Sequence, residues 1–557
     1  MAAVPRGYGR ALVDRFGGWF LSLPAETCSY TITPVRIPLR DGVELAGDLY
    51  LPVVSTANSK TAAHHHRSQL FAQGPYGRGL GTAVVEASLY AARGYQVLYV
   101  SCRGTFGSGG ELDPGRTEAD DGQDIVAWMR RQSWYPGSFA TIGASYLGYT
   151  QWALLHDPPT DLIAAIPNVA PHDYSRNYWG TGAFRLDRIL WSDRVSFQAG
   201  GDVGYLAWIS NAVGEQQRIR PVVEGIPLLD AVTRYFGSRA AWLERALVRP
   251  DTADEYYRPM KHYEALERVN VPVMLNTGWY DLFLEQTMEQ YARLRERGCD
   301  VELTVGPWAH IEASGIKVMP AMFAWIEEHV AKRSEREKKS PVRIFVTGAE
   351  EWRDVDVWPP ATTERQFYLH PNQGLSEEDP PESDQYSTFM YDPLDPTPTV
   401  GGPMLLGGGR VVDDSLAARS DVLTFTTEPL VEDIEVMGRP SVKLHHSSDH
   451  PHADIFVRLS TVDEKGKSQN VTECFKRLNP GETPGVIELT MTDCAHQFKK
   501  GARIRLVIAG GTFPLYARNL GSGGSSVTAS SAEKTEHRIA YGQDSASVLV
   551  FPIHASL

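Results

Sequence analysis

The sequence has few cysteines, and their spacing matches no metal or disulfide pattern. Among 557 residues only five cysteines occur, and no two of them form a CxxC pair. Neither a zinc site nor a disulfide framework is predicted, so reduced thiols are expected. The five are Cys28, Cys102, Cys299, Cys474 and Cys494.

Long hydrophobic runs and basic clusters are also missing. No segment approaches the roughly 18 consecutive apolar residues of a membrane helix, and residues 1–26 have no apolar core of signal-peptide length. The formal charge of −14 argues against a nucleic-acid partner, which would require a basic face. We therefore expect a cytoplasmic protein with neither a membrane nor a nucleic-acid partner, while a homo-oligomer stays open.

Alternating strand and helix patterns predict an α/β core with an insertion. Apolar runs at 96–101 and 301–305 and a helical stretch at 284–297 imply a parallel sheet with helical crossovers. After about residue 355, short alternating runs separated by Gly and Pro favour an antiparallel sandwich. The predicted segments are a first core part at 1–172, a helical cap insertion at 173–262, a second core part at 263–354 and a C-terminal β domain at 355–557.

Ser145 lies between a predicted strand at 139–142 and a predicted helix at 146–156, within Gly143-Ala144-Ser145-Tyr146-Leu147-Gly148. A tight strand-to-helix turn exposes a serine Oγ and aims the next backbone N–H at a developing oxyanion. The match to GxSxG is imperfect, because Leu147 occupies the position of the second glycine. From this pattern alone, an ordinary strand-to-helix turn is the alternative.

A catalytic serine requires a base and a carboxylate that orients the base, and in α/β hydrolases these follow the serine along the chain. Asp281 and His310 each come just after an apolar run, where the carboxyl ends of parallel strands form a site. Taken singly, Asp281 reads as a turn residue and His310 as a loop histidine. The order Ser145, Asp281, His310 at three strand ends is a stronger signal than any one of them.

Several further motifs accompany these three residues. They are Arg40-Asp41-Gly42-Val43-Glu44-Leu45, Gly74-Pro75-Tyr76-Gly77, Arg103-Gly104, the stretch 143–148, Gly278-Trp279-Tyr280-Asp281, Gly306-Pro307-Trp308-Ala309-His310 and Glu351-Trp352-Arg353. Through these motifs the chain resembles the cocaine-esterase and NonD (CocE/NonD) hydrolases, which are related to the X-Pro dipeptidyl-peptidases. In that family the form GxSYxG is the usual serine turn, so Leu147 is no longer an anomaly.

The resemblance implies an α/β-hydrolase core with an inserted helical cap and a C-terminal jelly-roll-like β domain. It implies Ser145 as nucleophile, His310 as general base and acid, and Asp281 as the group that orients His310. It also implies an oxyanion hole made by the Tyr76 hydroxyl and the Tyr146 backbone N–H. This chemistry requires no metal or organic cofactor.

The predicted activity is hydrolysis of a small-molecule ester, because an alkoxide leaves more readily than an amine and no acidic anchor for a peptide amino terminus can be assigned. An X-Pro dipeptidyl-peptidase or amidase, an acyltransferase or cyclisation catalyst, and a catalytically inactive binding protein are the alternatives. The residues predicted to line the substrate pocket, with a role in the core as the alternative, are Trp179, Trp279, Phe283 and Trp308.

Several histidines lie outside this constellation. His64, His65 and His66 are predicted to lie in an exposed loop rather than at a metal site. A solvated strand face rather than a metal site is also expected for Asp454, His445, His446, His450 and His452.

Overall fold

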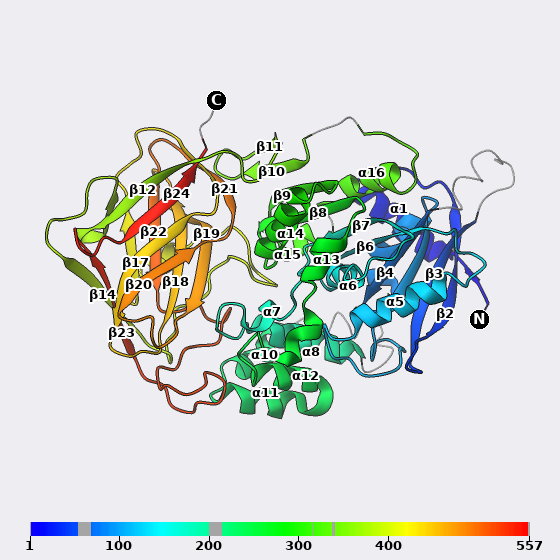
Figure 1. The fold of residues 1–557 in the computed structure, drawn as a ribbon, viewed down its shortest axis with the longest axis horizontal. Helices are drawn as coiled ribbons and strands as arrows, with labels where there is room; N and C mark the ends of the chain where they lie inside the picture. Colours follow the sequence, from blue (N-terminus) through cyan, green and yellow to red (C-terminus); the bar gives the residue numbers. More distant parts are fainter. Residues whose placement is uncertain (1, 54–67, 200–213, 316, 337–339, 555–557) are drawn as a thin grey trace.

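The computed structural model describes residues 2–53, 68–199, 214–315, 317–336 and 340–554. The run His64 to His66 lies outside the described residues. Two β-sheets organise the chain, the first formed by residues 4–355 and the second by residues 363–553 (Figure 1). The predicted α/β core and C-terminal β domain are thereby confirmed.

The first sheet is mixed, with a parallel centre and antiparallel edges. Its order, over the described residues, is β1-β2-β3-β5-β4-β6-β7-β8-β9-β10-β11. The strands are β1 (Val4–Pro5), β2 (Ser29–Pro38), β3 (Glu44–Val53), β4 (Gln69–Gly74), β5 (Gln96–Ser101), β6 (Phe139–Ala144), β7 (Leu162–Asn168), β8 (Val273–Tyr280), β9 (Val301–Ala309), β10 (Val342–Val346) and β11 (Glu351–Val355). From β5 and β4 through to β10, neighbouring strands pair in parallel, so their carboxyl ends share one edge.

Helices connect these strands and cover the sheet. The predicted helices at 146–156 and 284–297 are α6 and α14 in the structure. The helices of this part are α1 (Tyr8–Phe20), α3 (Leu80–Ala83), the π-helical turn η1 (Val84–Ser88), α4 (Leu89–Ala91), α5 (Glu118–Met129), α6 (Tyr146–Leu154), α14 (Leu284–Glu296), α15 (His310–Ala313) and α16 (Met319–His329).

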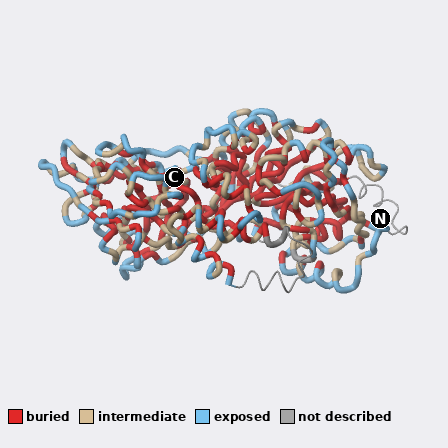
Figure 2. The backbone as a smooth tube through the Cα atoms, turned by 90° about the horizontal axis from the view of Figure 1, so that it is seen from below, coloured by how far each residue is buried: buried red, intermediate tan, exposed pale blue. Residues whose placement is uncertain are grey.

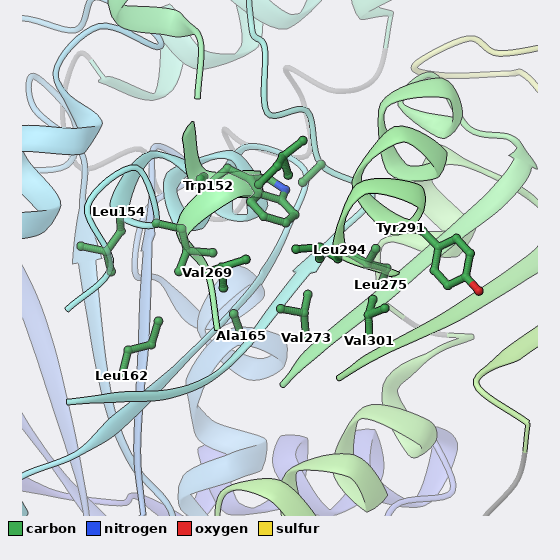
Figure 3. Packing of buried hydrophobic residues seen from close by; sticks show 14 of the residues in the cluster. Trp152, Leu154, Leu162, Ala165, Val269, Val273, Leu275, Tyr291, Leu294 and Val301 are labelled. Atoms are coloured by element: carbon green, nitrogen blue, oxygen red, sulfur yellow. The ribbon is translucent and has the colours of Figure 1, made fainter. Parts of the chain in front are cut away.

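The core of the α/β part lies between the sheet and its helices. Trp152 on α6, Leu275 on β8 and Val301 on β9 belong to one cluster of buried apolar side chains (Figure 3). Met437 and Ala495, from the second sheet, belong to the same cluster. The C-terminal β domain therefore packs on the α/β part through a shared hydrophobic core.

A helical segment separates β7 from β8. Its helices are α7 (Arg176–Trp179), α8 (Asp187–Ala199), α10 (Glu215–Val223), α11 (Leu228–Phe236), η2 (Gly237–Ala240), α12 (Ala241–Leu247), η3 (Glu255–Met260) and α13 (Tyr263–Arg268). Figure 1 shows α7, α8, α10, α11 and α12 gathered below the first sheet, whereas α13 lies level with the sheet. Aromatic side chains fill its interior, including Tyr178, Trp179 and Phe184.

The C-terminal β domain pairs its strands antiparallel almost throughout. Buried segments fill the interior of both halves of the molecule, and exposed ones lie at the periphery (Figure 2). Its elements are β12 (Thr363–His370), η4 (Pro371–Gln373), β13 (Gly374–Ser376), β14 (Gln385–Tyr391), α17 (Asp414–Ala417), β15 (Val422–Thr426), β16 (Ile434–Gly438), β17 (Ser441–Ser448), β18 (Asp454–Val462), β19 (Ser468–Arg477), β20 (Gly485–Thr490), β21 (Cys494–Phe498), β22 (Arg503–Ala509), β23 (Thr535–Tyr541) and β24 (Val548–Ile553).

Length and hydropathy distinguish all of these helices from membrane spans. Within the described ranges, no helix is both long enough and apolar enough to cross a bilayer.

Candidate active site

Ser145 occupies a strained turn between β6 and α6. Its φ of 60° and ψ of −119° are unusual for a residue with a side chain, and such strain is typical of serine nucleophile turns. The turn is fixed on both sides: the Ser145 N–H donates to Asn168 O at 2.9 Å, and the Tyr149 N–H donates to Ser145 O at 2.9 Å. The serine is therefore held at the carboxyl edge of the parallel sheet.

Gly148 explains why the glycine comes one place later than in GxSxG. A Cβ on Gly148 would lie 2.4 Å from the Ala170 Cβ and 3.0 Å from Asn168 O. The first turn of α6 thus packs directly against the chain that follows β7. A side chain at this position would push the helix, and with it the serine turn, away from the sheet.

Asp281 and His310 follow β8 and β9, and they complete a hydrogen-bonded relay with Ser145. His310 Nε2 lies 2.9 Å from Ser145 Oγ, and His310 Nδ1 lies 3.0 Å from Asp281 Oδ2. A carboxylate can only accept, so Nδ1 donates to Asp281, and Nε2 is left to accept the serine proton. Asp281 and His310 are each only 2% exposed, and this burial shields the relay from water.

The loop after β8 fixes the orientation of Asp281. Its second oxygen, Oδ1, accepts the backbone N–H of Phe283, so both carboxylate oxygens are engaged. The Phe283 ring meets the His310 ring edge-on, with centroids 5.3 Å apart. At the end of β8, a Cβ on Gly278 would lie 2.1 Å from Trp308 O, so the close approach of the β8 and β9 ends requires glycine.

Tyr76 follows β4 and lies beside the serine. Its hydroxyl oxygen accepts the indole N–H of Trp191, on α8, over 3.1 Å. Burial raises the pKa of Tyr76 above its ordinary value of 10.0, while hydrogen bonding with Trp191 and Ser145 acts in the opposite direction. The phenol is therefore neutral near pH 7 and keeps its proton for donation.

The Tyr146 backbone N–H has no intrahelical acceptor, because α6 begins at this residue. Its ring stacks on Trp191, with centroids 5.6 Å apart and planes 16° apart. Its hydroxyl donates to Glu118, which is 2% exposed. Burial raises the pKa of the Glu118 carboxyl to about 7. This contact could not be predicted from the sequence, because Glu118 is one of three acidic residues in the first turn of α5.

A cavity of about 360 Å³ opens beside the relay. Its walls are mostly apolar and come from the core, from α8 and from the loop after β14. The lining residues are Tyr76, Thr82, Val85, Glu86, Ala144, Ser145, Leu147, Leu190, Trp191, Arg194, His310, Ile311, Ser314, Gly315 and Leu405. A wider hollow of about 840 Å³ beside α1 has none of the relay residues in its walls.

The four aromatic residues predicted to line the pocket do not line this cavity. Trp179 lies in the interior of the helical segment and donates to Ala246 O, and Trp279 donates to Phe345 O beneath the sheet edge. The Phe283 ring packs edge-on against the His310 ring, and the Trp308 ring packs against the Trp352 ring. Their large apolar surfaces are used in packing, and Leu190, Trp191 and Leu405 supply the cavity wall instead.

Two family descriptions match the chain, one for each half. The X-Pro dipeptidyl-peptidase (S15 family) model matches residues 41–312, and the model of the X-Pro dipeptidyl-peptidase C-terminal non-catalytic domain matches residues 335–550. The first match contains Tyr76, Ser145, Asp281 and His310.

Similar proteins span nearly the whole chain. Cocaine esterase of Rhodococcus sp. (strain MB1 Bresler) is 28% identical over 93% of this chain and 98% of its own. Among solved structures, an α-amino acid ester hydrolase has a TM-score of 0.78 at 20% identity, covering 96% of this chain and 98% of its own. An aminopeptidase from a marine sediment archaeon, Thaumarchaeota archaeon, has a TM-score of 0.77 at 21% identity, covering 94% and 97%. These two structural likenesses concern the fold.

Proposed function

This chain is a serine ester hydrolase of the family that includes cocaine esterase and the S15 X-Pro dipeptidyl-peptidases, and we propose that it cleaves a carboxylic ester through an acyl-enzyme formed on Ser145. The observation that carries this proposal is the relay from Ser145 Oγ through His310 to Asp281, with distances of 2.9 and 3.0 Å. These distances lie within the range for proton transfer between a nucleophile and its base.

In the proposed first half-reaction, Ser145 Oγ attacks the ester carbonyl while its proton passes to His310 Nε2. Asp281 accepts the Nδ1–H of His310 and stabilises the imidazolium that forms. The carbon–oxygen bond of the ester then breaks, and His310 returns the proton to the departing alkoxide. In the second half-reaction, a water oxygen attacks the acyl carbonyl while His310 Nε2 takes the water proton. The bond between the acyl carbon and Ser145 Oγ then breaks, His310 returns the proton to Oγ, and the carboxylic acid leaves.

Negative charge develops on the carbonyl oxygen in both half-reactions. The Tyr76 hydroxyl and the Tyr146 backbone N–H are the two donors proposed to stabilise it. Because Trp191 donates to the Tyr76 oxygen, the Tyr76 proton remains available for another acceptor, and Tyr76 lines the same cavity as Ser145. This arrangement supports the proposed oxyanion hole.

A graded series of p-nitrophenyl esters tests the proposal. We expect the purified enzyme to hydrolyse short and medium acyl esters, since the cavity of about 360 Å³ has mostly apolar walls. Ser145→Ala should lose turnover, whereas Ser545→Ala, in the β domain, should retain it. An alkyl phosphonate should add its mass to the peptide that contains Ser145. Full turnover in Ser145→Ala, or labelling at another residue, would refute the serine mechanism.

The S15 match supports cleavage of an Xaa-Pro amide as a second candidate activity. Xaa-Pro p-nitroanilides compared with p-nitrophenyl esters at equal enzyme concentration distinguish the two. Turnover of the anilide without the ester would replace the proposed function by the peptidase activity. Acyl transfer is tested in the same assay by adding an alcohol or amine acceptor and looking for its acyl product.

A further inference from the structure

One wall of the catalytic cavity is built on a π-helical turn. The turn η1 follows α3 directly and carries Val85 and Glu86, which line the cavity together with Ser145 and His310. π-helical turns are rare in proteins, but many of those that occur lie at functional sites. The last residue of the turn, Ser88, donates to the buried carboxylate of Asp14 at 2.6 Å. This buried hydrogen bond holds the C-terminal end of the turn in place, while Glu86 lines the cavity.

The carboxylate of Glu86 has no charge partner in the part of the chain that the structure describes. Within those residues it makes neither a hydrogen bond nor an ion pair. Arg194 lines the same cavity, but Glu215 holds its guanidinium at 2.7 Å. Glu86 is partly buried at the cavity wall. A carboxylate that has lost part of its contact with water and has no partner favours a ligand that brings positive charge.

The cavity that Glu86 lines has mostly apolar walls. Val85, Leu190, Ile311 and Leu405 line the same cavity. Burial raises the pKa of Glu86 to about 7. An ion pair formed within such walls is stronger than one formed in open water, because fewer water molecules screen it. The ligand that fits best is therefore a cation with an apolar body.

We propose that Glu86 binds a positively charged nitrogen of the substrate, so that the enzyme selects amine-bearing or quaternary-ammonium esters over neutral ones. This inference rests on the proposed ester hydrolysis at Ser145. The carbonyl meets Ser145 while the cation lies against Glu86, within the single cavity that both residues line. One carboxylate is too few for a calcium ion, which takes six to eight oxygen ligands. Glu86 is not required as the base, because His310 already lies in position to accept the Ser145 proton.

Two pairs of esters test the proposal, and each pair differs mainly in charge. Benzoylcholine and 3,3-dimethylbutyl benzoate place the difference in the alcohol part, whereas p-nitrophenyl 6-aminohexanoate and p-nitrophenyl heptanoate place it in the acyl part. The readout is the ratio of kcat/KM for the cationic ester to that for its neutral partner. At least one pair should show a ratio that falls about tenfold in Glu86→Gln. The pair that responds identifies the part of the substrate that carries the charge.

Glu255→Gln is the matched control, because it removes the same charge from an exposed turn of the helical segment. Its ratios should equal those of the wild type. The proposal is overturned if neither ratio changes in Glu86→Gln, or if Glu255→Gln lowers them equally.

A binding measurement separates this inference from the proposed function. Benzyltrimethylammonium is titrated by calorimetry into Ser145→Ala and into Ser145→Ala/Glu86→Gln, neither of which has to turn over. We expect about tenfold weaker binding to the double variant. Equal binding, or no binding to Ser145→Ala, contradicts the role of Glu86. Ester turnover that survives in Ser145→Ala contradicts the serine mechanism, and the titration still decides the role of Glu86.

Discussion

The indole N–H of Trp191 donates a hydrogen bond to the hydroxyl oxygen of Tyr76 over 3.1 Å, and this contact joins the helical segment to the catalytic cavity. Trp191 is on α8, whereas Tyr76 follows a strand of the sheet. Because an indole can only donate, the Tyr76 oxygen accepts, and its own proton points elsewhere. The helical segment therefore contributes to the orientation of the proposed oxyanion donor as well as to the cavity wall.

Replacing Trp191 by Phe should lower kcat about tenfold and leave KM within about twofold, because the stack on Tyr146 is kept while the hydrogen bond to Tyr76 is lost. Tyr76→Phe alone should cost about 100- to 1000-fold in kcat. Initial rates for one p-nitrophenyl ester measure both. The double variant should be no slower than Tyr76→Phe, since the acceptor is already gone. Multiplicative losses would show that Trp191 acts independently of Tyr76.

Replacing Asp281 by Asn should lower kcat by about 10,000-fold. The asparagine amide can donate to His310 Nδ1, which favours the tautomer whose Nε2 carries a proton and cannot accept one from Ser145. Steady-state kinetics give the loss, and circular dichroism checks that the variant is folded. A loss below tenfold in a folded variant would exclude Asp281 as the residue that orients His310.

The placement of Ser145, Asp281 and His310 at one edge of the sheet could be predicted, because it depends on local pattern and on one topological rule. Ser145, Asp281 and His310 each follow an apolar run, and parallel strands place their carboxyl ends at one edge. The structure brings these three residues within hydrogen-bonding distance at that edge. The bounds of α14 agree with the predicted helix to within one residue.

The cavity wall could not be predicted in the same way. Aromatic side chains bury large areas wherever they lie, so the sequence does not distinguish Trp179, which fills the helical segment, from Trp191, which faces the cavity. Glu86 lies on a π-helical turn that lines the cavity, and no sequence pattern predicts such a turn.

The expectation of a solvated strand face was wrong for His446 and for Asp454. His537, on the unpredicted strand β23, covers His446, and Asp454 is buried in an ion pair with Arg477.

Replacing Gly148 by Ala should destabilise the protein by about 1–3 kcal/mol and reduce kcat, because the added Cβ would lie 2.4 Å from the Ala170 Cβ. The strain falls on the first turn of α6, which positions Ser145. Thermal unfolding and esterase rates measure both effects. Gly481→Ala is the control, since a Cβ there meets nothing within 4 Å. Equal unfolding temperatures for the two variants would refute this packing argument.

A buried histidine pair should make the protein less stable in acid. His446 Nε2 and His537 Nδ1 lie 3.1 Å apart, with the side chains 3% and 1% exposed. Burial lowers the pKa of His446 from 6.5 to about 4 and that of His537 to about 3. Below pH 6.5 the unfolded chain therefore binds protons that the folded chain does not. The free energy of unfolding should fall as the pH drops from 6.5 to 4, by up to about 1.4 kcal/mol per pH unit for each histidine.

His446→Gln isolates the share of one histidine, because glutamine keeps a hydrogen-bonding group beside His537 but takes up no proton. Urea unfolding at pH 7.5, 6 and 5 gives the slope of stability against pH, to which the other buried histidines also contribute. The slope for His446→Gln should be smaller than that of the wild type by up to about 1.4 kcal/mol per pH unit, which corresponds to one proton. His450→Gln, on a nearby loop, should leave the slope nearly unchanged. If His446→Gln and the wild type have the same slope, His446 takes up its proton equally in both states, and burial in the β domain does not keep it neutral.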